Sequence, residues 1–160
     1  MKNFFELFSL PVDFFVDQDA LEKKYLEFQN QFHPDISSSS DISLSIEINA
    51  AYKILSDDFA RACYILKLNG VDIQNDEKAV KVDVATLERV LELQEKIAEL
   101  ADKNEIEELR EKLNSEIKFL IAAAVKCFGS SEIQLAAQFL VKAKYLKKSA
   151  EDLKIRKRKL

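Results

Sequence analysis

The chain contains 160 residues, with 24 Lys and Arg against 28 Asp and Glu, which gives a formal net charge of -4. Apolar residues make up 48% of the sequence, enough for a folded core and too many for a disordered protein. Only two Gly and two Pro are present, too few for the tight turns of a sandwich, a barrel or a βαβ series, so the composition predicts a mostly helical fold.

The N-terminal half predicts three helical segments. A short apolar segment begins at Phe4 and ends before Pro11, because proline disfavours helical backbone at the residue before it. A second helix is predicted over residues 19–32, with Asp19 and Glu22 as a capping box. Its apolar residues repeat at i, i+4, i+7 and i+11 and form a one-sided stripe. They are Leu21, Tyr25, Phe28 and Phe32. A third helix is predicted over residues 41–68, ending at Gly70.

The stretch from Asn69 to Val84 shows no sustained helical period and divides the chain. Residues 1–75 carry 6 basic and 12 acidic side chains, whereas residues 76–160 carry 18 and 16, and such asymmetry suggests two parts with different surfaces. We therefore expect an N-terminal domain over residues 1–72, a linker over 73–84 and a C-terminal domain over 85–160.

The C-terminal half predicts three more helices, over residues 85–102, 105–128 and 131–155. Asn104 with Glu107 forms a predicted capping box, while Gly129 and Ser131 provide a helix stop and the next N-cap. Connections of two or three residues force neighbouring helices to run antiparallel, so we expect an all-α chain that ends in an up-down-up three-helix bundle. The expected core face of the last helix is Leu135, Phe139, Ala143, Leu146, Ala150 and Leu153.

The motif His33-Pro34-Asp35 lies between the second and third predicted helices and leads into a serine-rich loop. The third helix then contains Asn49-Ala-Ala-Tyr52 and Arg61-Ala62. Motif, flanking helices and downstream block together resemble the J domain of DnaJ-type co-chaperones. With its helical C-terminal part and no Gly/Phe-rich or Cys-repeat region, the whole chain resembles the HscB-type J-domain co-chaperones of iron–sulfur cluster assembly.

The resemblance implies an adaptor that performs no bond chemistry and needs no cofactor. His33, Pro34, Asp35 and the second helix, with Lys23 and Lys24, would dock on the ATPase domain of a DnaK-like chaperone, HscA, and accelerate its ATP hydrolysis. The C-terminal bundle would deliver the scaffold protein IscU as client. Many J domains have a Lys directly after the motif, where this chain has isoleucine, which predicts a weaker or more selective electrostatic encounter. The alternative for the two lysines is a solvated helix face.

The helix predicted over residues 85–102 carries two leucines outside its core stripe. At about 100° per residue, the core stripe consists of Val90, Leu93, Ile97 and Leu100. Leu87 and Leu91 fall beside a row of glutamates, and an apolar centre with a charged rim is typical of a protein-binding patch. Alternatively, these leucines pack beneath other elements and the glutamates only solvate a surface.

The resemblance implies that this helix holds the client surface. The matching positions are Leu87, Leu91, Glu92, Glu95 and Glu99, together with Tyr145 on the last helix. Glu88 stands where some relatives have an apolar residue. The alternative for Tyr145 is an isolated exposed side chain, which is common and needs no explanation.

Other classes of function find less support in the sequence. A general J-domain co-chaperone with another client, a helical scaffold with an accidental His-Pro-Asp, and a thiol enzyme remain alternatives. Cys63 and Cys127 lie in apolar helical sequence, where buried thiols are inert. One His and two distant Cys cannot provide the four ligands of a zinc or iron–sulfur site, so we expect no metal.

The cysteines, the apolar runs and the basic tail bear on where the protein is located and on whether it binds nucleic acid. Two distant cysteines and the lack of a secretory or membrane-spanning apolar run predict a cytoplasmic protein without a membrane partner. The basic residues 154–159 are interpreted as a frayed helix end. Since the chain is acidic overall and has no aromatic platform, we expect no nucleic-acid partner.

Overall fold

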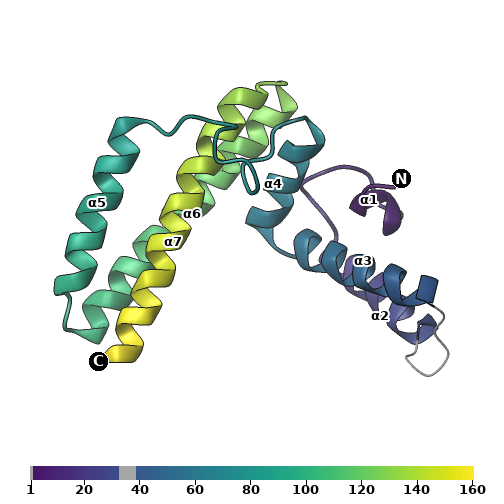
Figure 1. Ribbon diagram of the computed structural model, residues 1–160, viewed down its shortest axis with the longest axis horizontal. Helices are drawn as coiled ribbons and strands as arrows, with labels where there is room; N and C mark the ends of the chain where they lie inside the picture. Colours follow the sequence, from purple (N-terminus) through teal and green to yellow (C-terminus); the bar gives the residue numbers. More distant parts are fainter. Residues whose placement is uncertain (1, 33–38) are drawn as a thin grey trace. The chain divides into compact units, whose positions relative to one another are not determined.

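The computed structural model describes residues 2–32 and 39–160, which contain helices and no strand (Figure 1). The helices are α1 (Phe4–Leu7), α2 (Gln18–Gln31), α3 (Ser39–Leu55), α4 (Asp58–Leu68), α5 (Val84–Glu99), α6 (Lys103–Gly129) and α7 (Ile133–Lys159). The all-α prediction is confirmed. The chain divides into two compact units, Met1–Ile65 and Leu66–Leu160, each described separately below.

The N-terminal unit is built around an aromatic cluster that fixes α1 in place. Asn3 and Glu6 form a capping box at the start of α1, whose Phe5 is fully buried. The ring of Tyr64 stacks on Phe4 and Phe5, with centroid distances of 4.7 and 5.9 Å, and its hydroxyl accepts a hydrogen bond from the Phe4 N–H at 2.9 Å. These contacts bury the short helix, which could not be stable alone.

The predicted single helix over residues 41–68 is wrong, because α3 ends at Leu55 and α4 begins at Asp58. The Asp57 carboxylate accepts a hydrogen bond from the Ala60 N–H at 2.8 Å, which is the N-cap interaction that starts a new helix. The predicted capping box of the second helix is also wrong. Asp17, two residues before Asp19, is the N-cap of α2.

A buried guanidinium group joins three segments of the N-terminal unit. Arg61 is only 3% exposed, and it donates to the carbonyl oxygens of Leu55 (2.8 Å) and Phe14 (2.6 Å) and to the Asp58 carboxylate (2.7 Å). Its guanidinium carbon lies 4.5 Å from the centroid of the Phe14 ring. Arg61 thus holds together the loop before α2, the end of α3 and the start of α4.

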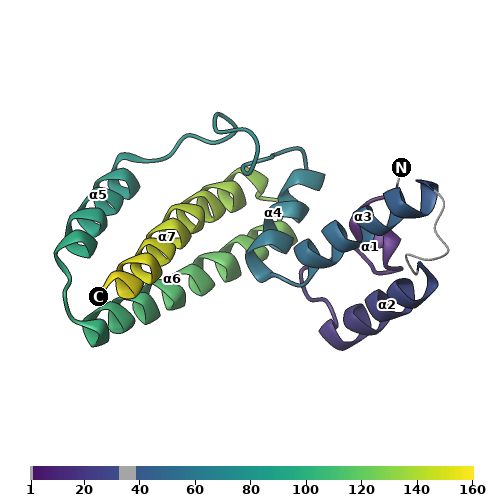
Figure 2. The ribbon, with the colours of Figure 1, turned by 60° about the horizontal axis from the view of Figure 1, so that its bottom comes forward.

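The C-terminal unit is a bundle in which α6 and α7 lie side by side and α5 packs against α7 (Figure 2). The predicted caps at Asn104 and Ser131 are wrong: Asp102 caps α6, and Glu132 occupies the N-cap position of α7. The predicted core face of α7 is partly wrong, because Leu135 is 39% exposed and Phe139 is half-buried. The buried face consists of Ala136, Ala137, Leu140, Val141, Ala143, Leu146, Ser149, Ala150 and Leu153.

The expected linker, residues 73–84, lies within the C-terminal unit, and part of it packs on the bundle. Asp72 begins the segment with a turn in which its carboxylate accepts hydrogen bonds from the N–H groups of Gln74 and Asn75, both at 3.1 Å. Ile73 is 3% exposed, and its carbonyl oxygen accepts a hydrogen bond from Lys144 Nζ on α7 at 2.7 Å. The start of the segment is therefore fastened to α7.

The position of α5 depends on an ion pair and a helix cap. Arg89 on α5 makes a bidentate salt bridge with Glu116 on α6, with Nη2 and Oε2 separated by 2.6 Å. Hydrogen bonding to Arg89 lowers the pKa of Glu116, and hydrogen bonding to Glu116 raises the pKa of Arg89. At the start of the helix, the carboxylate of Asp83 accepts a hydrogen bond from the Thr86 N–H at 2.7 Å, and the Thr86 side chain also lowers the Asp83 pKa.

We predict that Arg61→Met lowers the free energy of unfolding of the N-terminal unit by about 2–4 kcal/mol, because two carbonyl groups lose a charged donor. Urea unfolding followed by tyrosine fluorescence measures this change, since Tyr25, Tyr52 and Tyr64 all lie in that unit. Lys53→Met, which removes an exposed cation from α3, is the control and should cost less than about 0.5 kcal/mol. Equal losses for the two variants would contradict the role given to Arg61.

We predict that Glu116→Gln costs about 1 kcal/mol of unfolding free energy near neutral pH, since the pair is partly exposed and screened. The folded-state pKa of Glu116 is lowered, so its contribution is present above the ordinary value of 4.5 and is lost as the pH falls below that value. Urea titrations near neutral pH and in acid should therefore show the difference from wild type closing in acid. Glu111→Gln, an exposed carboxylate of the same helix, is the control. If wild type and Glu116→Gln still differ in unfolding free energy in acid, this explanation is wrong.

Candidate functional site: two protein-binding surfaces

His33, Pro34 and Asp35 lie outside the residues that the structure describes, but the helices on both sides are defined. Helix α2 ends at Gln31, and helix α3 begins at Ser39. Tyr25 and Tyr52 stack with a centroid distance of 4.0 Å and an interplanar angle of 9°. The side-chain oxygen of Asn49 accepts hydrogen bonds from the Tyr25 hydroxyl (2.8 Å) and Gln29 Nε2 (3.0 Å). These contacts hold α2 and α3 together as a hairpin.

The two basic residues of α2 have different surroundings. Lys23 is exposed, whereas Lys24 is half-buried and its ammonium group lies 5.6 Å from the centroid of the Phe28 ring. A cation at this distance is attracted to the ring face. Phe28 in turn packs edge-on against Phe8, which is buried. Lys24 is therefore positioned by the Phe28 ring, and Lys23 presents its charge to solvent.

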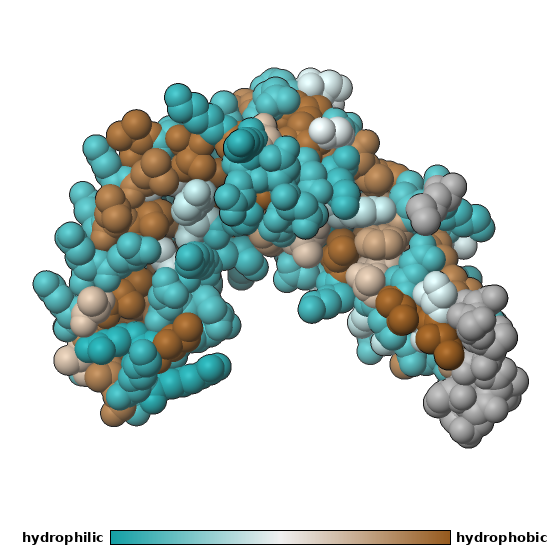
Figure 3. Space-filling view, viewed as in Figure 1, coloured by the Kyte–Doolittle hydropathy of each residue, from teal (hydrophilic) through white to brown (hydrophobic). Residues whose placement is uncertain are grey.

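The outer face of α5 carries an apolar stripe formed by Val84, Leu87 and Leu91, which are 69%, 42% and 60% exposed. Leu93 and Ile97 point the other way and are buried, as the sequence predicts. Figure 3 shows brown apolar patches along α5, at the left of the view, among teal hydrophilic ones. Val84 is absent from the predicted patch because the predicted helix begins one residue later; the aspartate before Val84 is the N-cap signal that marks the true start.

Four glutamates form an acidic flank along this stripe. They are Glu88, Glu92, Glu95 and Glu99, and all of them are exposed. At 100° per residue, the four project on the same side of the stripe, between it and Lys96. The arrangement can bind an apolar partner surface that carries positive charge on one side.

The structure brings Leu87, Leu91 and the predicted glutamates together on one helix and places Tyr145 elsewhere. Tyr145 is half-buried on α7 and lines a pocket of about 410 Å³ between that helix and the segment 73–82. None of the residues that line this pocket belongs to α5. Tyr145 is thus part of a concave site next to the connecting segment.

The basic end of the chain is packed, so its interpretation as a frayed helix end is wrong. Helix α7 continues to Lys159. Arg156 Nε donates to the Leu100 carbonyl oxygen at 2.8 Å, and Lys157 Nζ lies 2.8 Å from Glu107 Oε2. Hydrogen bonding to Lys157 lowers the pKa of Glu107. Two of the tail's cations therefore fasten α7 to the rest of the bundle.

Neither cysteine has the surroundings of a nucleophile. Cys63 and Cys127 are both buried thiols, and desolvation raises the pKa of Cys127, which disfavours the reactive thiolate. Within residues 2–32 and 39–160, no group of three or more His, Cys, Asp and Glu side chains could hold a metal ion. Over the same stretches, every helix falls short of the length or the apolar character needed to cross a bilayer.

The chain is similar to known proteins over nearly its whole length. Residues 82–154 match the family described as the HSCB C-terminal oligomerisation domain. The Co-chaperone protein HscB homolog of Psychromonas ingrahamii is 32% identical over 99% of this chain and 98% of its own length. The Iron-sulfur cluster co-chaperone protein HscB homolog of Arabidopsis thaliana is 27% identical, covering 94% of this chain and 62% of that protein.

The fold is also similar to that of a solved co-chaperone structure. The crystal structure of the human co-chaperone protein HscB superposes with a TM-score of 0.86 and 26% identity, over 100% of this chain and 84% of the human one. The resemblance implies two paired helices that flank His33-Pro34-Asp35 in the sequence, followed by a helical bundle; α2, α3 and the bundle agree with this architecture. The chain belongs to the HscB family of J-type co-chaperones.

Proposed function

We propose that the chain assists iron–sulfur cluster assembly by coupling a DnaK-like chaperone, HscA, to the scaffold protein IscU. Residues 1–72 would stimulate the chaperone's ATPase, and residues 85–160 would deliver the client. The match over almost the whole chain to a relative named a co-chaperone carries this proposal, and the Arabidopsis relative's name supplies the iron–sulfur context. We also propose a cytoplasmic location, since two buried thiols suit a reducing compartment.

The chaperone-binding surface would consist of the His-Pro-Asp segment and the exposed side of α2. A co-chaperone accelerates hydrolysis only by binding one state of its partner better than another. In this division of roles, Pro34 stiffens the turn, Asp35 offers a carboxylate to a partner cation, and His33 orients the segment by hydrogen bonding. The contacts of Asn49 and Tyr52 with α2 support the proposal, because they hold together the two helices between which the segment lies in the sequence.

The client-binding surface would be the apolar stripe of α5 with its acidic flank, together with Tyr145. Exposed leucines in the centre of a patch provide affinity when a partner removes them from water. The glutamates mainly affect the rate of encounter and the choice of partner. The Arg89–Glu116 salt bridge supports this assignment, because it holds the stripe on a fixed helix and so reduces the ordering cost of binding.

We expect Asp35→Asn to reduce the stimulation of HscA by about tenfold or more, since loss of a charged contact of this kind costs roughly 1.5–3 kcal/mol. Single-turnover ATP hydrolysis by HscA, with wild type or variant added, measures the effect. Glu47→Gln removes a half-buried carboxylate from α3 and is the control, which should stimulate like wild type. Full stimulation by the Asp35 variant would remove the role given to this carboxylate.

We expect Leu87→Ala, Leu91→Ala and Tyr145→Ala, combined in one chain, to weaken IscU binding by more than about tenfold, because each truncation at the centre of an interface commonly costs about 1 kcal/mol. Isothermal titration of IscU into the co-chaperone gives the affinity. Phe119→Ala on α6, which is 72% exposed, is the matched control. Unchanged affinity of the triple variant refutes the client surface. Stimulation of HscA without any binding of IscU by wild type would instead favour a different client.

A further inference from the structure

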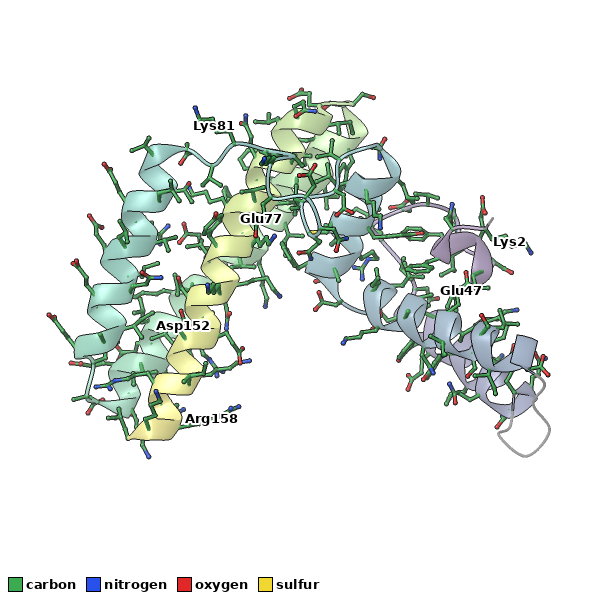
Figure 4. The ribbon with its side chains drawn as sticks, viewed as in Figure 1. Lys2, Glu47, Glu77, Lys81, Asp152 and Arg158 are labelled. Carbon is green, nitrogen blue, oxygen red and sulfur yellow. The ribbon has the colours of Figure 1, made fainter. Side chains whose placement is uncertain are left out.

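The segment between α4 and α5 forms one wall of the pocket that contains Tyr145. Ile73, Val80 and Val82 line the pocket from the segment, and Val141 and Tyr145 line it from α7. Figure 4 shows Glu77 beside α7, while Lys81 points away from the bundle. Four charged residues complete the lining, so this concave site of about 410 Å³ presents apolar and polar surface in about equal share. Concave sites that combine the two kinds of surface are the usual places at which proteins bind ligands.

Contacts at the start of the segment fasten one wall of this pocket to α7. The hydrogen bond from Lys144 Nζ to the Ile73 carbonyl oxygen joins the two walls, and Ile73 itself is buried. The turn closed by Asp72 fixes the start of the segment, and the Asp83 cap fixes its end at α5. Because the Ile73 end of the segment is already bonded to α7, a ligand would not have to order that end, which favours affinity.

The pocket continues into the apolar stripe of α5. Val82 lines the pocket, Asp83 caps the helix, and Val84 is the first and most exposed member of the stripe. In Figure 3, brown patches extend from the upper end of α5 toward the segment that precedes it. One partner could therefore cover the pocket and the stripe together.

The charges next to this path are mainly acidic. Asp76 and Glu77 line the pocket on the segment side, and the acidic flank follows along α5. The two pocket lysines are on α7, and one of them, Lys144, is already bonded to the Ile73 carbonyl oxygen. A segment that runs from the pocket along α5 thus passes the two pocket carboxylates and the four of the acidic flank, and positive charge on that segment would be complementary to them.

We propose that this pocket is an anchor site for the client, and that it takes one large aliphatic or aromatic side chain. The side chain belongs to a client segment whose further apolar residues lie on the stripe and whose Lys or Arg residues face the acidic flank. The inference rests on the function proposed above and adds residues 73–82 to the client surface. A large side chain buried in a preformed pocket is the usual form of an interface hot spot.

The test uses the full chain and IscU, with titration calorimetry as the readout. Val80→Asp places a charge on an apolar wall of the pocket and should weaken IscU binding by about tenfold or more. Ala79→Asp adds the same charge one residue away, at a half-buried position that does not line the pocket, and should change the affinity by less than about twofold. Stimulation of HscA without client reports that the N-terminal unit is intact and should be the same for both variants.

The outcomes separate this inference from the proposed function. Wild-type affinity of Val80→Asp, with loss of affinity in Leu87→Ala plus Leu91→Ala, overturns the anchor pocket and leaves the α5 surface in place. Wild-type affinity in all of these variants overturns both. If Val80→Asp lowers the melting temperature, photo-crosslinking tests the pocket instead. With p-benzoylphenylalanine in place of Asp76, the chain should form a crosslink to IscU. With the same residue in place of Phe119, it should form none. No adduct from position 76 overturns the pocket.

Discussion

The N-cap hydrogen bond of an aspartate carboxylate fixes the start of four of the longer helices. Asp17, Asp57, Asp83 and Asp102 accept from the first free N–H groups of α2, α4, α5 and α6. With only two glycines and two prolines in the chain, these caps decide where one helix stops and the next begins. Asp83 makes Val84 the first residue of α5, so Val84 joins Leu87 and Leu91 on one helical stripe.

Hydrophobic periodicity predicted the helices and the outer leucines of α5, because large side chains there repeat on clearly separated faces. It failed at the break after Leu55, where Ser56 and Asp57 lie inside an otherwise helical pattern and only the cap reveals the boundary. It also failed on α7. Alanines such as Ala136 and Ala137 face the core there, and Leu135 does not, so packing against α6 rather than side-chain size selects the face. The anchor-pocket wall at Val80 has no periodic signal at all.

The two proposed surfaces would bind their partners through different kinds of interaction. The α2–α3 hairpin is held by aromatic stacking and by one shared acceptor, Asn49, and its basic side chains suit a partner bound by charge and shape. The α5 surface offers apolar area beside carboxylates, which suits a partner that buries leucines. Because the surfaces lie in different compact units, a substitution in one can be assayed without altering the other.

Both sulfur atoms of the cysteines are shielded. Cys63 and Cys127 are 4% and 7% exposed, and burial keeps the second of them protonated. Peroxides and electrophiles react with accessible thiolates, so the chain presents them with no suitable target. A thiol-directed reagent would therefore modify either cysteine only after the helices around it open locally.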